Sequence, residues 1–321
     1  MPRISQKHIP LLSTIGVFLL LYAIASLRYD RFFTVRVFLN FFRDNSFLGI
    51  IAVGMTFVIL SGGIDLSVGS VLALTTVVAA LLIERLGVHP ALAIVAVLVM
   101  GTAIGFAMGC VIHHVGIAPF IVTLAGLFFA RGLALVLCDG SITIDNPIYR
   151  AVTAWKIPIG RTGLPLTALT FLAVLVVGIY VSVYTSFGRN VYAIGGNEEA
   201  AMLMGVPIGK TKIGVYTLSG FCSALAGVIY TLYGSSGDPR AGVGLELDAI
   251  ASVVVGGTLL SGGVGYVFGT LIGVLIFGVI QTAITFENLN SWWTRVAIGL
   301  LLLLFILLQR LFARPRLRAN A

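Results

Sequence analysis

The chain has 321 residues, of which 59% are hydrophobic and 10% are charged. A soluble domain carries about 25% charged residues, so this composition excludes a soluble globular protein and indicates an integral membrane protein. The formal charge of +8 is spread thinly along the chain, which fits a lipid surface as the partner and does not indicate a nucleic acid.

About ten apolar stretches are long enough, or nearly so, to cross a bilayer as helices. They lie near residues 9 to 27, 46 to 60, 67 to 83, 91 to 112, 117 to 138, 165 to 184, 213 to 233, 245 to 260, 264 to 284 and 294 to 312. Their unbroken apolar character favours helices over the alternating strands of a membrane barrel. The sequence therefore predicts an all-α integral membrane protein, a single transmembrane domain over residues 1–321 with about ten helices.

The first stretch follows a basic start and resembles a secretory signal, but many further spans come after it. We therefore interpret it as an uncleaved first helix. Both ends of the chain and the loop at about 185–212 are predicted to be cytoplasmic because they are basic. The residues concerned are Arg3, Lys7, Arg189, Lys210, Lys212, Arg310, Arg314, Arg316 and Arg318. Arg28, Arg31, Arg36 and Arg43 would then face outward, so charge alone does not decide the orientation.

Two of the short apolar stretches end in the same letters, SGG. The residues are Ser61, Gly62 and Gly63 in the first copy and Ser261, Gly262 and Gly263 in the second. Short, glycine-interrupted spans in two halves of a transporter are typical of a substrate path at mid-membrane. We predict a helix break at each copy and place a translocation path there, with Asp65, Ser67 and Gly69. The copies reflect either an internal repeat or convergence, and lying six predicted spans apart they do not fit an inverted repeat.

Asp65 is an acidic residue within this apolar region. A carboxylate at a helix centre costs about 2.5 to 3.5 kcal/mol, so it requires a polar path or hydrogen-bond partners. Asp65 either lines the path or caps the helix that follows, with Ser67 and Ser70 as alternative caps. The two roles are compatible.

Other charged residues occur near the predicted outer ends of the spans. Arg131 either extends to the outer surface or pairs with Asp139 or Asp145. Glu246 and Asp248 open the eighth stretch, where the helix dipole favours acids, and are candidates for a gate at the outer mouth.

The loop at about 185–212 contains the pattern of a short capped helix. Asn197 is a good N-cap, Glu198 and Glu199 follow in the first turn, and Gly205 and Pro207 end the helix. The segment comprises Gly196, Asn197, Glu198, Glu199, Ala200, Ala201, Met202, Leu203, Met204 and Gly205. A helix from 198 to 204 would offer its apolar residues either to a groove on a partner or to its own subunit.

The sequence gives no sign of catalysis or of a cofactor on this chain. Residues 205–211 read GVPIGKT, with three residues between the glycines instead of the four of a phosphate-binding loop. Without such a loop, LSGG at 60–63 and 260–263 is no ATPase signature. Cys110, Cys138 and Cys222 have neither metal-ligand nor disulfide spacing, so no metal site is expected.

Three longer segments carry a resemblance to a known family. GGNEEAAMLMGV, VILSGGIDLSVGSVLAL and ELDAIASVVVGGTLLSGGVG resemble the permeases of bacterial ABC importers for monosaccharides, the ribose, xylose and galactofuranose group. The similarity covers nearly the whole chain and is strongest to a galactofuranose importer permease, in FLGIIAVGMTFVILSGGIDLSVGS and SWWTRVAIG. The resemblance implies a multi-pass protein of the bacterial inner membrane with the cobalamin-type (type II) importer fold.

The resemblance also implies partners. These are cytoplasmic ABC ATPase subunits that bind ATP and Mg, a periplasmic sugar-binding protein, and a second, related permease subunit. Gly195–Val206 would be the coupling helix that docks on the ATPase, and the path at Asp65 would conduct a sugar. The alternative is a self-sufficient sugar transporter in which Asp65 or Glu246 carries a proton.

Overall fold

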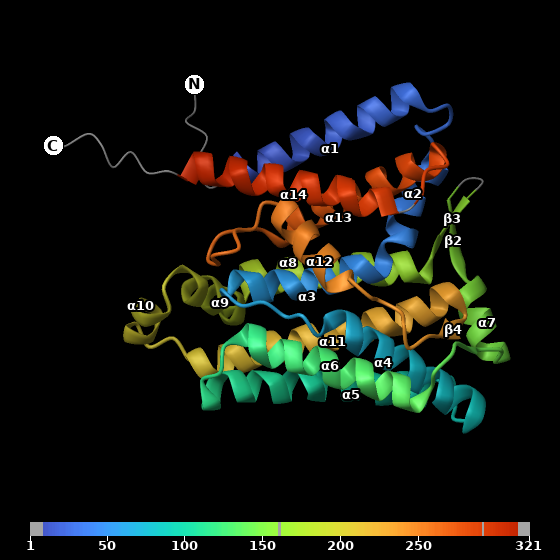
Figure 1. Cartoon of the computed structure of the whole chain (residues 1–321), viewed down its shortest axis with the longest axis horizontal. Helices are drawn as coiled ribbons and strands as arrows, with labels where there is room; N and C mark the ends of the chain where they lie inside the picture. The colour runs from blue at the N-terminus through green and yellow to red at the C-terminus, as the bar shows by residue number, and fades with distance from the viewer. Residues whose placement is uncertain (1–8, 160–161, 291, 314–321) are drawn as a thin grey trace.

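Long helices lying side by side make up most of the protein (Figure 1). The computed structural model describes residues 9–159, 162–290 and 292–313. The helices are α1 (Ile9–Arg28), α2 (Val35–Asp44), α3 (Ser46–Leu60), α4 (Val68–Ala80), η2 (Leu81–Arg85), α5 (Pro90–Cys110), η3 (Val111–Val115), α6 (Pro119–Leu137), α7 (Pro147–Ala154), α8 (Leu166–Tyr184), α9 (Ser186–Gly196), α10 (Glu198–Leu203), α11 (Ile208–Gly234), α12 (Leu245–Val255), α13 (Val267–Phe286) and α14 (Trp292–Ala313).

Two short antiparallel strand pairs accompany the helices. β1 (Ile142–Thr143) pairs with β4 (Ser236–Gly237), and β2 (Lys156–Ile159) pairs with β3 (Thr162–Pro165). The predicted helical membrane protein is thus confirmed in its main feature, with two small strand pairs that the apolar pattern did not indicate.

The described residues contain seven helices that are long and apolar enough to cross a membrane. The pair α2 and α3, bent by 57°, makes an eighth candidate. One predicted span differs, because 245 to 260 forms only the 11-residue helix α12, whereas α14 (Trp292–Ala313) covers the predicted span 294 to 312. A helix of 11 residues rises roughly 16 Å, about half the thickness of the hydrocarbon core. Ten complete spans are therefore not evident among the residues that the structure describes.

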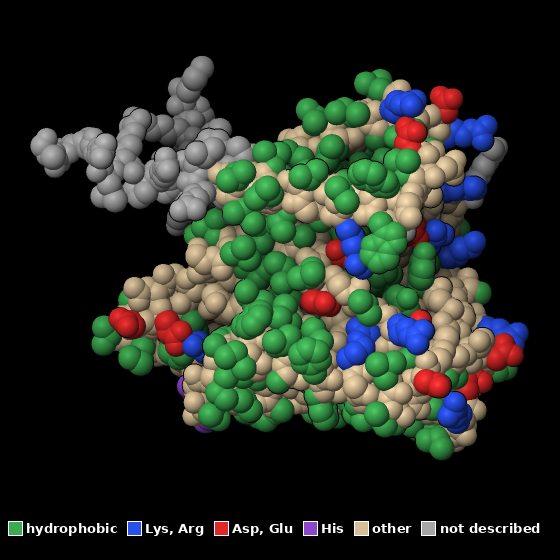
Figure 2. Space-filling model, viewed as in Figure 1, with side chains coloured by type: hydrophobic (Ala, Val, Ile, Leu, Met, Phe, Trp, Pro, Cys, Tyr) green, Lys and Arg blue, Asp and Glu red, His purple; other side chains and the backbone are tan. Residues whose placement is uncertain are grey.

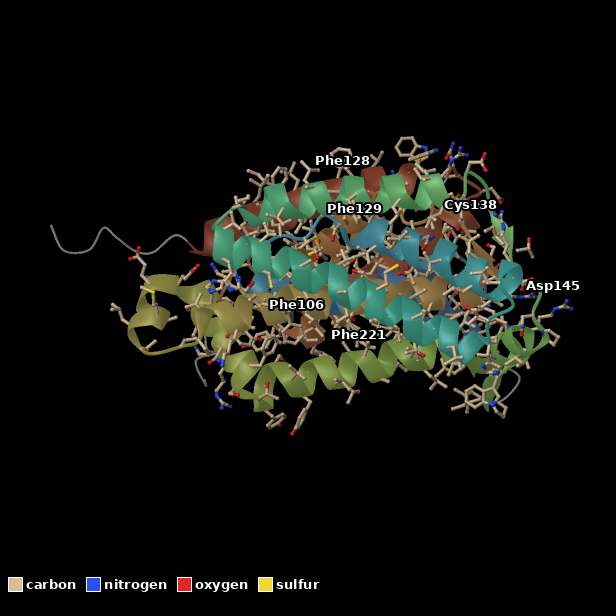
Figure 3. All side chains as sticks on the ribbon, turned by 90° about the horizontal axis from the view of Figure 1, so that it is seen from below. Phe106, Phe128, Phe129, Cys138, Asp145 and Phe221 are labelled. Carbon is tan, nitrogen blue, oxygen red and sulfur yellow. The ribbon has the colours of Figure 1, made fainter. Side chains whose placement is uncertain are left out.

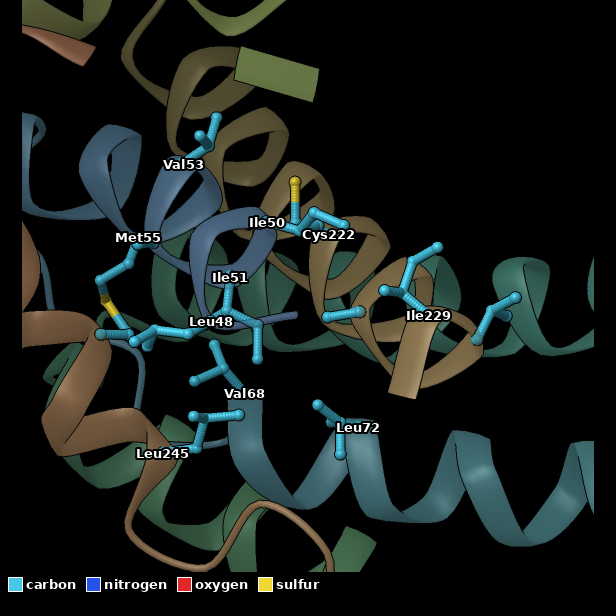
Figure 4. Close-up of a cluster of buried hydrophobic side chains, with 14 of the residues drawn as sticks. Leu48, Ile50, Ile51, Val53, Met55, Val68, Leu72, Cys222, Ile229 and Leu245 are labelled. Atoms are coloured by element: carbon cyan, nitrogen blue, oxygen red, sulfur yellow. The ribbon is translucent and has the colours of Figure 1, made fainter. Parts of the chain in front are cut away.

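Helix α3 forms the centre of the molecule. All of its residues except Phe47 are buried. Leu48 and Ile51 belong to a large apolar cluster that α4 and α11 also enter, through residues such as Val68 and Ile229 (Figure 4). A helix that is apolar all round is expected to be buried, which explains this position.

Small residues allow the extensive helix contact between α5 and α11. Gly101, Gly105 and Gly109 repeat every four residues on α5 and face α11. A Cβ on Gly109 would lie 2.9 Å from Cα of Ile213, and one on Gly220 would lie 2.9 Å from Cα of Gly105. Spacing of small residues by four is a common basis of helix packing in membranes.

The molecule has two polar ends, which define its orientation. Helix α10 projects from one end, called here the α10 side, and α7 with the β2–β3 pair lies at the other, the α7 side (Figure 1). Helix α1 begins and α14 ends on the α10 side (Figure 1). Arg3, Lys7, Arg314, Arg316 and Arg318, on which the predicted orientation partly depends, lie outside the described residues.

Candidate functional site

The first predicted break is present between α3 and α4. Gly62 has a φ of +82°, its N–H donates to the Ile59 carbonyl at 2.9 Å, and the Gly63 N–H donates to the Val58 carbonyl at 3.0 Å. This pair of bonds is a Schellman motif, which requires a left-handed residue and so favours glycine. The SGG letters therefore end α3 for a local backbone reason.

Asp65 anchors the backbone between the two helices. Its side chain is fully buried. Oδ1 accepts from the Ser67 N–H at 2.9 Å and from Ser67 Oγ at 2.6 Å, and Oδ2 accepts from Ser219 Oγ of α11 at 2.7 Å. Asp65, rather than Ser67 or Ser70, thus binds the amide at the start of α4, while Ser61 donates elsewhere, to the Val58 carbonyl. Such bonds stabilise a buried carboxylate.

The second predicted break is also present, but it begins earlier than expected. The Gly257 N–H donates to the Val254 carbonyl at 2.9 Å and the Thr258 N–H donates to the Val253 carbonyl at 3.2 Å, again as a Schellman motif. Gly257 has a φ of +95°. Helix α12 therefore ends before Gly256, and Ser261, Gly262 and Gly263 lie in the following loop. The Gly256-Gly257 pair, not SGG, is the helix stop.

Both breaks meet the end of α9 at one point, which we call the glycine junction. It consists of Leu60, Gly62, Gly195, Gly196, Gly262 and Gly263. The Gly263 N–H donates to the Leu60 carbonyl at 2.9 Å. A Cβ on Gly262 would lie 2.8 Å from the Gly62 nitrogen, and one on Gly195 would overlap the Leu60 carbonyl oxygen. Three chain segments are therefore in backbone contact, and Gly195, Gly262 and Gly263 leave no room there for a Cβ.

A tyrosine adds a second link between α9 and the second break. The Tyr192 hydroxyl donates to the Gly265 carbonyl at 2.9 Å. Burial raises the pKa of Tyr192 to about 12, so the hydroxyl keeps its proton at neutral pH. Sequence reasoning missed Tyr192 as a site residue, and it named Gly195 only as the start of the segment matched to a coupling helix, not as a contact of the breaks.

Helix α10 follows the glycine junction directly and confirms the predicted capped helix. The Asn197 side chain accepts from the Ala200 N–H at 2.9 Å, and Gly205 ends the segment with a φ of +78°. Glu198 pairs with Lys212 of α11 at 2.7 Å. Ala201 is buried, whereas Met202, Leu203 and Met204 are 61%, 87% and 74% exposed. Helix α10 thus packs on its own chain through one small residue and exposes three large apolar ones.

The predicted path residues fall into two groups. Gly62 and Ser261 are exposed and Ser61 and Gly263 are half-buried, all at the breaks. The other five, Gly63, Asp65, Ser67, Gly69 and Gly262, are buried inside the chain. A Cβ on Gly69 would lie 2.6 Å from Glu246 Oε2, so Gly69 brings α4 close to the start of α12.

Charged side chains at the α7-side end of α12 form a separate group, the outer charged group. It consists of Arg131, Glu246, Asp248 and Arg295. Arg131 Nη1 donates to the carbonyls of Pro239 and Ala241, at 2.6 and 2.7 Å, and Arg295 Nη2 donates to the Val243 carbonyl at 3.1 Å. Both arginines thereby hold the loop that leads into α12. Figure 2 shows Lys, Arg, Asp and Glu side chains among hydrophobic ones on the face that it presents.

The expected carboxylate partners of Arg131 are not its partners in the structure. Asp145 pairs with Arg150, and the acids that act electrostatically on Arg131 are Glu246 and Asp238. Spacing along the sequence indicates only nearby partners for Arg131. It cannot predict contacts with the loop that follows α11. Among the described residues, no three His, Cys, Asp or Glu side chains lie close enough to share a metal ion.

Comparison with known proteins connects this arrangement to transport. Residues 37–306 match the family model "Branched-chain amino acid transport system / permease component". The inner membrane ABC transporter permease protein YjfF of Escherichia coli K12 is 54% identical over 95% of this chain and 93% of its own length. The ribose import permease RbsC of Bacillus subtilis 168 is 42% identical over 96% and 94%, and the D-allose permease AlsC of Escherichia coli K12 is 33% identical over 90% and 88%.

No solved structure matches the chain significantly. The family match covers most of the sequence, and the apolar helices agree with it. The chain therefore belongs to this family of ABC transporter permease components, and it is a multi-pass protein of the inner membrane.

Proposed function

We propose that this chain forms the membrane path of an ATP-driven importer for a monosaccharide and receives its driving force from a separate ATPase through α10. The observation that carries the proposal is the continuity from the exposed residues of α10 to the glycine junction and from there to both helix breaks. A displacement of α10 would be transmitted to both breaks together, because the backbones of the three segments are in direct contact and closely packed.

The partners in this proposal are three kinds of protein. An ABC ATPase binds ATP and Mg and docks on Met202, Leu203 and Met204, which are apolar and exposed. A periplasmic sugar-binding protein delivers substrate to the α7 side. A second, related permease covers the face with the outer charged group, because charges at membrane depth require polar neighbours or a water-filled path. Glu246 and Asp248 would then form a gate at the outer mouth.

The fold proposed for the assembled protein is the cobalamin-type importer fold with about ten helices in one domain, residues 1–321. In it, α12 and α14 complete the set of spans beside the second permease. The sugar path runs past the exposed residues of the breaks, Ser61, Gly62 and Ser261, while Asp65 holds the first break in shape. Polar groups that bind hydroxyls weakly suit conduction, since tight binding would prevent release.

The substrate class follows from the names of the relatives, which include import permeases for ribose, fructose and D-allose. Galactofuranose is the first sugar to test, given the resemblance of the segments around residues 47–70 and 291–299. The test is uptake of labelled monosaccharides by vesicles that contain the chain with its ATPase and binding protein. Uptake that needs ATP and survives a protonophore supports the proposal. Uptake by the chain alone that a protonophore abolishes would instead show proton-coupled transport.

A further inference from the structure

An apolar groove lies between α5 and α8. It has a volume of about 920 Å³, within the roughly 300–1,000 Å³ typical of small-molecule pockets. Its floor is formed by α3 and α11, through residues such as Val53 and Leu218, and its walls include Phe106 and Val177. In Figure 3, Phe106 and Phe221 lie between α5 and α8, whereas Phe128 and Phe129 lie on the opposite side.

One side of α11 supplies more of the groove lining than any other helix. The residues are Lys210, Ile213, Gly214, Thr217, Leu218, Phe221, Cys222 and Leu225. They recur every three or four positions, so they form one stripe along the helix. The stripe begins with a lysine at the α10 side and is otherwise mainly apolar, which gives the groove one basic end and a long apolar body.

The basic end has further polar groups. A second cavity of about 280 Å³ adjoins Lys210 and is lined by His113, His114 and Gly209. The two histidine rings are 4.9 Å apart, and the His113 ring lies against Gly209. Among the described residues Lys210 makes no ion pair, in contrast to Lys212, which pairs with Glu198. Lys210 is exposed and therefore available to an anion.

We propose that this groove is a binding site for an anionic phospholipid of the leaflet on the α10 side. One acyl chain lies along the α11 stripe, past Phe221 and Val177. The phosphate meets the Lys210 ammonium and an N–H group of His113, because His114 Nδ1 already bonds the Cys110 carbonyl. Basic pockets at the ends of membrane helices favour anionic headgroups, and the apolar part of a lysine side chain packs well against lipid. The site does not depend on the proposed sugar path.

The test uses tryptophan fluorescence of the full-length chain in phosphatidylcholine nanodiscs. A Phe221→Trp reporter is titrated with phospholipids whose acyl chains are brominated, either phosphatidylglycerol or phosphatidylcholine, and the signal of the parent chain is subtracted. We expect half-quenching at about fivefold less phosphatidylglycerol, the factor that one lysine near an anionic surface supplies. Lys210→Gln should remove this preference and Lys210→Arg should keep it. Phe106→Trp, on the facing wall, replaces the reporter if Phe221→Trp fails to fold.

The matched control is Phe128→Trp, because Phe128 is 68% exposed on α6, away from the groove. It should be quenched equally by both lipids. Equal quenching of the groove reporter by both lipids overturns the proposal, as does a preference that survives Lys210→Gln. Failure of both lipids to quench, as expected for a groove filled by a protein helix, also overturns it. Neither ATP nor sugar enters the measurement, so its outcome is separate from that of the transport assay.

Discussion

Asp65 contributes to stability through buried hydrogen bonds. Its carboxylate accepts three hydrogen bonds from Ser67 and Ser219 and is fully buried. The contact with Ser67 is local and was within reach of sequence reasoning, since an aspartate side chain often accepts from the backbone N–H two residues further on. The contact with Ser219 was not predictable, because the two residues are 154 positions apart.

Replacing this acid tests its structural role. Asp65→Ala leaves the Ser67 and Ser219 donors without an acceptor, and each buried unpaired donor costs about 1–3 kcal/mol. We expect a lower thermal midpoint and a lower yield of monodisperse protein in detergent, with reduced transport as a consequence. Asp65→Asn, which keeps acceptor capacity, should be less damaging.

The control for this change is Asp139→Ala, because Asp139 is exposed. Its thermal midpoint should match that of the parent chain. If Asp65→Ala is as stable as Asp139→Ala and transports normally, the carboxylate neither holds the break nor contributes to the path.

Comparison of the predicted and observed helices shows which helix ends can be predicted from a sequence. Predicted spans 46 to 60 and 165 to 184 agree closely with α3 and α8, because an SGG stop and a Pro start mark their boundaries. The end of α12 was placed too late, since the Gly256-Gly257 stop lies within an apolar run. Helix α9 was missed because it is short and only partly apolar, and its role depends on contacts with both breaks.

The exposed residues of α10 allow ATPase docking to be tested separately from the stability of the chain. Leu203 is 87% exposed, so Leu203→Ser should change stability by less than about 0.5 kcal/mol. If the ATPase docks there, loss of one buried leucine, worth about 1.5–3 kcal/mol, should weaken binding of the ATPase by tenfold or more. Binding of the purified ATPase to the chain in nanodiscs measures this directly.

A second exposed leucine, Leu86, provides the control variant for Leu203→Ser. Leu86 is 70% exposed and follows η2, beyond the far end of α4. Leu86→Ser should leave ATPase binding unchanged. Normal binding by Leu203→Ser, or equal weakening by both variants, would count against α10 as the docking site. The charge reversal Glu199→Lys is expected to act in the same direction as Leu203→Ser, because it places a cation at the start of α10.

At the scale of the whole molecule, composition and apolar periodicity predicted the class and the approximate spans. They did not predict that the two SGG copies touch each other, because helix contacts between distant segments leave no periodic signal. The glycine junction could therefore be identified only from the structure, although the sequence contains all of its glycines.

The orientation of the chain is testable with single cysteines. Figure 3 shows Asp145 at the end of the molecule away from α10, and Leu203 is part of α10. In a background without Cys110, Cys138 and Cys222, Asp145→Cys should react with a membrane-impermeant maleimide in intact spheroplasts. Leu203→Cys should react only after permeabilisation. The reverse pattern would place α10 outside and would exclude docking of a cytoplasmic ATPase there.

The most direct test of the account compares two neighbouring glycines in the assembled transporter. A Cβ on Gly195 would overlap the Leu60 carbonyl oxygen and lie 2.5 Å from the Gly263 nitrogen, whereas one on Gly196 meets nothing within 4 Å. ATP-dependent sugar uptake is measured in vesicles with equal amounts of folded Gly195→Ala and Gly196→Ala protein. We predict near-normal uptake for Gly196→Ala and uptake reduced about fivefold or more for Gly195→Ala, since relieving such an overlap costs roughly 1–3 kcal/mol. Equal, normal uptake by both variants would contradict a coupling route through the glycine junction.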